Sequence, residues 1–135
     1  MKIIGFNLTK MSAERKEKSE KELRISQNID ITEIIKEKVH ISEEEALKTH
    51  FSFVVDYSGD FAKIEFNGFV LLLPEKEELK QTLKNWKDKK LTDEFKVPLF
   101  NFIMNKCNIK ALNLEDELSL PPHIQMPKIS PKKQE

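Results

Sequence analysis

Several residue types are scarce in this 135-residue sequence, and each scarcity excludes a class of protein. A single cysteine, Cys107, excludes an internal disulfide framework and indicates a reducing compartment. Three glycines in the whole chain exclude the glycine-rich dinucleotide loop and the phosphate-binding P-loop. The G-x-S-x-G motif of the nucleophile elbow is also missing.

The sequence also lacks an excess of either charge and any long apolar run. It has 23 Lys and Arg against 23 Asp and Glu, so it has no long-range positive field to attract nucleic acids or anionic membranes. The longest apolar stretch, Phe69–Leu73, is too short to span a bilayer, and the first eight residues lack the apolar run of a signal peptide. We therefore expect a soluble cytoplasmic protein without membrane insertion.

Alternating apolar residues near the N-terminus predict two strands. Ile4, Phe6 and Leu8 alternate with small or polar residues, which is typical of a half-buried strand. Between Ser12 and Arg24, nine of thirteen residues are charged and no apolar stripe is present, so this block is predicted as a solvated strand extension and connection rather than a helix. A second, exposed strand is predicted from four odd-numbered apolar residues, Leu23, Ile25, Ile29 and Ile31.

The clearest pattern predicts a β-hairpin over about residues 47–73. Apolar residues stand on odd positions in the first run (Leu47, Phe51, Phe53, Val55, Tyr57) and on even positions in the second (Ile64, Phe66, Val70, Leu72). Ser58-Gly59-Asp60 has the length and composition of the connecting loop. Phe69, Leu71 and Leu73 predict that the far end of the second strand is covered on both faces. Before the hairpin, Ser42–Glu45 has the form of a capping box, with room for one helical turn.

Two helices and an extended tail are predicted after Pro74. Leu79, Leu83 and Trp86 form a narrow apolar stripe on a first helix that begins with glutamates and ends with lysines. A second stripe runs from Phe95 to Cys107 with Thr92 as N-cap, and Pro98 predicts either a kink or a later start near Val97. Residues 121–135 contain four prolines, which predicts an extended tail with its last few residues disordered, so the chain divides into one domain, residues 1–120, and a tail, residues 121–135.

The residues that carry chemistry are not grouped in a catalytic or metal-binding pattern. His40, His50 and His123 are scattered, without further ligands at metal-binding spacing, and are interpreted as surface or hairpin histidines. Cys107 lies on an apolar helix stripe and is interpreted as a buried structural thiol. The carboxylates alternate with lysines, as on a solvated face. We expect no catalytic residue, no metal and no cofactor; a small enzyme is the least supported reading.

Two features suggest binding of another polypeptide. Nine of the eleven aromatic residues are phenylalanines, and the alternative to ordinary core packing is a partly exposed groove that accepts apolar segments. The region of residues 12–31 also offers unpaired strand edges, which can hydrogen-bond to a partner's backbone.

The order of the predicted elements and two short motifs resemble the SecB family of export chaperones over residues 2–120. Phe66-Asn67-Gly68-Phe69-Val70 is similar to the end of that family's fourth strand. Ala111-Leu112-Asn113-Leu114 resembles the linker that joins its two helices, and Phe100–Met104 would then lie on the long helix. The resemblance implies an α+β fold in which a four-stranded antiparallel sheet is followed by C-terminal helices, here with an extended proline-rich tail.

The resemblance further implies an ATP-independent chaperone that forms dimers or tetramers and binds unfolded or nascent polypeptides in apolar grooves. The family docks on the protein-translocation machinery through an acidic surface, whereas this chain has no net charge. The candidate groove residues are Ile29, Ile31, Phe51, Phe53, Leu114 and Leu118, with the two phenylalanines also compatible with a core position. The candidate residues of an oligomer interface are Ile4, Phe6, Trp86, Phe100 and Met104, and Trp86 is equally suited to complete the helix stripe.

The alternative function is a ribosome-associated or assembly-bound subunit without catalytic activity. Lysines near the end of the first helix and in the tail would contact RNA or protein; the opposing reading is that they only confer solubility, because nearby carboxylates cancel their field. The lysines concerned are Lys84, Lys87, Lys89, Lys90, Lys128, Lys132 and Lys133.

Overall fold

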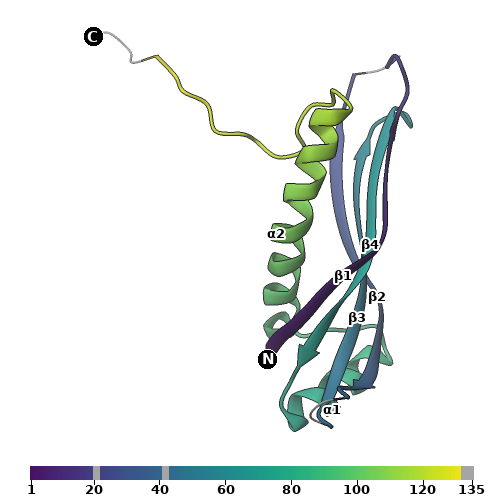
Figure 1. Ribbon diagram of the computed structural model, residues 1–135, viewed down its shortest axis with the longest axis vertical. Helices are drawn as coiled ribbons and strands as arrows, with labels where there is room; N and C mark the ends of the chain where they lie inside the picture. Colours follow the sequence, from purple (N-terminus) through teal and green to yellow (C-terminus); the bar gives the residue numbers. More distant parts are fainter. Residues whose placement is uncertain (20–21, 41–42, 132–135) are drawn as a thin grey trace.

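A computed structural model describes residues 1–19, 22–40 and 43–131, and it contains one sheet and two helices. The elements in chain order are β1 (Lys2–Arg15), β2 (Ile25–Lys38), β3 (Glu45–Tyr57), β4 (Ala62–Leu73), α1 (Lys76–Trp86) and α2 (Asp93–Glu117). Helix α2 runs along one face of the sheet, α1 lies at one end, and the C-terminal segment leaves at the other end (Figure 1). The predicted fold class, a four-stranded antiparallel sheet followed by C-terminal helices, is confirmed.

The strands are arranged in the order β1-β4-β3-β2, and all neighbouring strands are antiparallel. The predicted hairpin is therefore the centre of the sheet, with Leu47 opposite Leu72 and Tyr57 opposite Ala62. The two N-terminal strands, β1 and β2, form the two edges. Within the described sheet, each edge strand pairs with a neighbouring strand on one side only. Its other side presents a row of backbone N–H and C=O groups that can pair with another strand.

The core lies between the sheet and α2. The helix buries a row of residues at intervals of four: Phe95, Leu99, Ile103, Cys107, Ala111 and Glu115. The sheet meets it with alternate residues of β3 and β4, including Phe51, Phe53, Ile64, Phe66 and Val70. Cys107 is fully buried in this row, which confirms its structural interpretation.

Strand β2 is longer than the sequence pattern predicts, because it contains a bulge. Its register shifts between Ile31 and Glu33, so one extra residue separates the inward-facing positions. Ile34 consequently takes the buried position after Ile29 and Ile31, and Ile35 is 39% exposed. The alternation therefore changes phase at Thr32, and the strand continues to Lys38.

A similar bulge changes the interpretation of β1. Ile3 pairs with Leu72 and Gly5 with Leu71, which leaves Ile4 without a partner in the register. Ile3 packs against the core, whereas Ile4 is 38% exposed. Ile4 therefore does not share the inward face of β1 with Phe6, and the predicted grouping is wrong for Ile4.

Two predictions about the helices are corrected. Helix α2 begins at Asp93, with the Thr92 hydroxyl accepting a hydrogen bond from the backbone N–H of Phe95, so the predicted cap is confirmed and the predicted later start is wrong. Packing of Phe95 and Leu99 on either side of Pro98 holds both parts of the helix against the core. Residues 111–114 are an internal part of this helix and do not form a linker.

Two smaller predictions also change. Glu43 and Glu44 are not helical and Glu45 begins β3, so the predicted helical turn is absent there; Ser42 of the capping box lies outside the described residues. Phe69, Leu71 and Leu73 are half-buried rather than covered. The ammonium group of Lys48 lies 4.3 Å from the Phe69 ring centroid and shields part of that face.

The C-terminal segment follows α2 without regular structure. Residues 121–131 contain neither helix nor strand, as the prolines predict. The predicted disorder of the last few residues falls on residues 132–135, outside the described part of the chain. Within the described residues, neither helix combines the length and apolar content needed to cross a membrane.

Candidate peptide-binding groove

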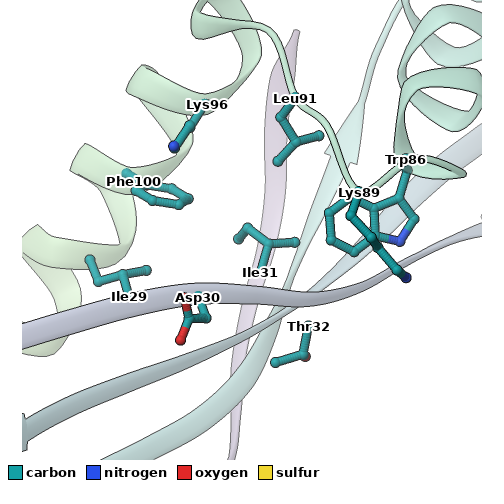
Figure 2. A pocket seen from close by; sticks show the side chains of 9 residues that line it. All are labelled: Ile29, Asp30, Ile31, Thr32, Trp86, Lys89, Leu91, Lys96 and Phe100. Atoms are coloured by element: carbon teal, nitrogen blue, oxygen red, sulfur yellow. The ribbon is translucent and has the colours of Figure 1, made fainter.

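A pocket of about 430 Å³ lies between α2 and the edge strand β2. We call the strip between these two elements, from this pocket to the site of His123, the groove. Figure 2 shows four segments meeting there: Ile29 and Ile31 on β2, Phe100 on α2, Leu91 on the connection between the helices, and Trp86 at the end of α1. All five side chains are partly exposed, so apolar surface remains available to a ligand.

Two lysines border the apolar part of the pocket. Lys96 lies on α2 and Lys89 on the connection between the helices, whereas the side chain of Asp30 points to the other side of β2 (Figure 2). The Lys96 ammonium lies 5.3 Å from the Phe100 ring centroid, and that of Lys89 lies 4.4 Å from the Trp86 ring centroid. The two rings thus each carry a cation–π contact, and the pocket has an apolar floor with a polar rim.

The other end of the groove is polar. Phe100, Met104 and Asn108 are spaced by four residues and lie on the same flank of α2, so Asn108 faces the β2 side as Phe100 does. The ring of His123 lies against this flank, with Nε2 2.8 Å from Asn108 Oδ1. Its Nδ1 lies 2.7 Å from Glu115 Oε2, and the side chains of His123 and Glu115 are 0% and 1% exposed.

The carboxylate of Glu115 organises this polar end. An ionised carboxylate only accepts hydrogen bonds, so Nδ1 of His123 is the donor in its contact with Glu115. The backbone N–H of His123 also donates to Glu115 Oε1, at 3.0 Å. Burial, followed by the charge of Glu115, raises the pKa of Tyr57 above its ordinary value. The Tyr57 hydroxyl therefore stays protonated and donates to the carbonyl oxygen of Pro121.

The sequence interpretation missed this end of the groove. His123 is buried in a hydrogen-bonded pair, so its interpretation as a surface histidine is wrong. Glu115 closes the buried row of α2, so the interpretation of the carboxylates as a solvated face is wrong for this residue. The spacing of that row by four residues, continued one step beyond Ala111, was the signal that could have found it.

The candidate groove residues occupy three different places. Ile29 and Ile31 line the pocket. Phe51 and Phe53 lie in the core beneath α2, with exposures of 1% and 0%. Leu114 and Leu118 are half-buried and are not part of the pocket lining; near them, Arg15 of β1 donates to the carbonyl oxygen of Leu118 at 2.8 Å.

The candidate interface residues are also separated. Trp86 and Phe100 line the pocket, and Met104 continues the same helix flank. Phe6 packs inward on β1, with its ring 5.7 Å from that of Phe51 and 5.8 Å from that of Phe102. Only Ile4 of the five is classed as exposed.

The lysines of the alternative function lie mostly on the surface. Lys84, Lys87 and Lys90 are exposed, and Lys128 is exposed on the C-terminal segment. Lys132 and Lys133 lie outside the described residues. In the part of the chain that the structure describes, no three His, Cys, Asp or Glu side chains are grouped so as to hold a metal ion.

The comparisons with known proteins identify the architecture as SecB-like. The chain matches the structure of the Mycobacterium tuberculosis SecB-like chaperone Rv1957, solved in complex with a ChAD peptide from the Rv1956 HigA1 antitoxin. The two share 17% sequence identity over 98% of this chain and 92% of the other, with a TM-score of 0.56. No family model matches the sequence, and no curated protein matches it. The similarity is one of fold.

Proposed function

We propose that this protein is an ATP-independent chaperone that binds unfolded or nascent polypeptides in the groove between α2 and β2. The observation that carries the proposal is the pocket formed by Ile29, Ile31 and Phe100 beside an edge strand. Apolar walls bind any exposed core segment by burying its surface, without reading its sequence. Binding by apolar contact would allow one groove to accept many different client sequences.

The edge strand β2 would supply the backbone part of the interaction. It is hydrogen-bonded to β3 alone within the described sheet, so its outer row of N–H and C=O groups suits an extended client segment. Alternate client side chains would then face Ile29 and Ile31, and Lys89 and Lys96 at the rim would contact polar groups of the client. The apolar contacts and the backbone hydrogen bonds would both form without nucleotide hydrolysis.

The fold neighbour supports this proposal. The Mycobacterium tuberculosis chaperone was solved with a bound peptide, and this chain shares its fold over nearly its whole length. We propose that peptide binding is common to both. A link to protein export, with the translocation machinery as partner, is the less supported part of the proposal because the present chain carries no net charge.

We also propose that the protein acts in the cytoplasm as a dimer or tetramer. The single thiol, buried in the core, suits a reducing compartment. The exposed Ile4 on edge strand β1 is an apolar position that a second copy would cover. Sedimentation equilibrium tests this part: we expect a mass of two or four chains, and a single-chain mass at micromolar concentration would contradict it.

The function is tested by suppressing the aggregation of a denatured client in the absence of ATP. We expect light scattering to fall as the protein is added in molar excess. The double variant Ile29→Thr, Ile31→Thr keeps β-branched residues in the strand but removes apolar surface from the pocket. Its affinity for an unfolded client is expected to fall by about fivefold or more.

Ile35→Thr is the matched control, since it makes the same change on the same strand at a position outside the pocket. It should bind the client as the unmodified chain does. No suppression by the unmodified protein at a several-fold excess, or equal losses in the pocket and control variants, would contradict the proposal.

A further inference from the structure

The first three residues of the C-terminal segment, Pro121, Pro122 and His123, lie in the polar end of the groove. We call residues 121–123 the strap. His123 contacts Asn108, which is on the flank of α2 that faces β2, and its ring lies 6.2 Å from the ring of Phe53 in an edge-on arrangement. Phe53 is opposite Ile29 in the sheet register, so the strap and the open pocket lie over adjacent parts of one sheet face.

The strap is held as an extended peptide ligand would be. It has no helix or strand structure of its own. Its backbone is bound at two points, because the Tyr57 hydroxyl donates to the carbonyl oxygen of Pro121 and the N–H of His123 donates to Glu115. One side chain, the imidazole of His123, enters between Glu115 and Asn108 and is wholly buried. Main-chain capture combined with one side-chain pocket is the usual arrangement in peptide recognition.

The groups that receive the strap belong to rigid elements. Tyr57 and Phe53 lie on β3, and Asn108 and Glu115 lie on α2. Departure of the strap would leave the carboxylate of Glu115 and the hydroxyl of Tyr57 facing an open groove. Such groups can exchange one hydrogen-bonding partner for another of the same chemistry.

We propose that the strap is an intramolecular ligand of the client groove. This inference rests on the proposed function. The polar end is a subsite for an extended segment whose side chain offers an N–H donor to Glu115, as the imidazole of His123 does, and the strap occupies it in cis. A client then fills only the open pocket, or displaces the strap and binds along the whole groove. Because the subsite is available only in the fraction of molecules whose strap has left, the apparent client affinity falls by that fraction.

The exposed residues that follow the strap are consistent with a segment that can leave. Ile124, Met126 and Ile129 are 36%, 45% and 102% exposed, so residues beyond His123 add little to the attachment. The segment extends away from α2 (Figure 1). Attachment therefore depends mainly on the strap itself.

The test compares the full chain with a chain that ends at Leu120. The probe is a fluorescent synthetic peptide of residues 119–130, followed by anisotropy. We expect the shortened chain to bind this peptide in trans and the full chain to bind it at least about tenfold more weakly, because its subsite is already filled. A peptide with His123→Ala is the matched control and should bind the shortened chain at least about tenfold more weakly than the natural peptide.

A permanently unfolded client, reduced and carboxymethylated lactalbumin, gives the second measurement. The shortened chain should bind it several-fold more tightly than the full chain, and the natural tail peptide should reverse this gain. Equal client binding by both chains, with no competition by the peptide, would overturn the inference and leave the proposed function intact. If the shortened chain binds the tail peptide but neither chain binds the client, the proposed function is wrong and the strap is only an intramolecular contact.

Circular dichroism shows whether the shortened chain folds. If it does not, the full chain with His123→Ala replaces it, since this change removes the anchoring side chain of the strap and leaves Glu115 and Asn108 in place to receive a ligand. This variant should bind both the tail peptide and the client more tightly than the unmodified chain does. Weaker or unchanged binding of both would overturn the inference.

Discussion

Glu115 and His123 tie the C-terminal segment to the core through a pair of buried side chains. Both side chains are buried, and Nδ1 of His123 lies 2.7 Å from Oε2 of Glu115. Removal of one partner leaves the other without its hydrogen bonds in a low-dielectric environment, which costs more than the pair contributes when intact. The pair therefore fixes where residues 121–123 lie.

Replacement of Glu115 by alanine is expected to lower the free energy of unfolding by about 3 kcal/mol. Urea unfolding followed by circular dichroism measures this. Glu117→Ala is the control, because Glu117 is an exposed carboxylate on the same helix and its loss should change stability by less than about 0.5 kcal/mol. Equal stabilities of the two variants would show that the buried pair contributes nothing.

Cys107 provides a second prediction about a single residue. Burial raises the pKa of its thiol to about 12, so at pH 8 only about one folded molecule in ten thousand carries the thiolate. Alkylation by iodoacetamide should therefore be slow in the native protein and should accelerate in proportion to unfolding in urea. Rapid labelling without denaturant would contradict the buried position.

Sequence reasoning located Cys107 but not the Glu115–His123 pair. The thiol is part of a regular apolar stripe, which is a local signal. The pair joins a helix to an irregular segment beyond two prolines, and no periodic pattern describes such a segment. The fully exposed Ile129 a few residues later shows that composition alone does not distinguish attached from free residues there.

At the scale of elements, the approach of β1 to β4 depends on Gly68. A Cβ atom added at this position would lie 2.2 Å from the carbonyl oxygen of Asn7 and 3.0 Å from Cα of Leu8. Both atoms belong to the backbone of β1, next to the register shift between Leu8 and Lys10. A side chain there cannot be accommodated without moving the strand.

Gly68→Ala should therefore destabilise the protein by about 2 kcal/mol or more and increase hydrogen exchange along β1. Gly5→Ala is the matched control on the same pair of strands. Its Cβ would meet Cδ1 of Leu71 at 3.3 Å, the end of a flexible side chain, so a smaller loss is expected. A greater loss at Gly5 than at Gly68 would contradict this account of the strand pairing.

The elements were predicted where local patterns persist and missed where the register shifts. The β3–β4 hairpin, α1 and the Thr92 cap follow from alternation, helix periodicity and a capping residue. The bulges in β1 and β2 are set by pairing with distant strands, so Ile4 and Ile34 were misplaced or overlooked. The predicted linker at residues 111–114 is wrong because Ala111 continues the buried row of α2 and the helix runs on to Glu117.

At the scale of the whole molecule, α2 covers one sheet face, and no helix of the described residues covers the other (Figure 1). The two faces differ in the aromatic residues they offer. Phe100 lies in the pocket on the covered side, and Phe69 lies on the opposite face beneath Lys48. The chain as a whole has no net charge, so under the proposed function we expect apolar contact to decide which face receives an unfolded chain.

Site-specific photo-crosslinking tests the choice of face most directly. A photoreactive phenylalanine analogue is placed at position 100 in one protein and at position 69 in another, and each is irradiated with reduced, carboxymethylated lactalbumin. Both positions are half-buried phenylalanines, so the substitutions are matched in size and chemistry. Our account predicts a crosslinked client at position 100 and little at position 69. Crosslinking at position 69 alone, or at neither position, would contradict client binding in the groove between α2 and β2.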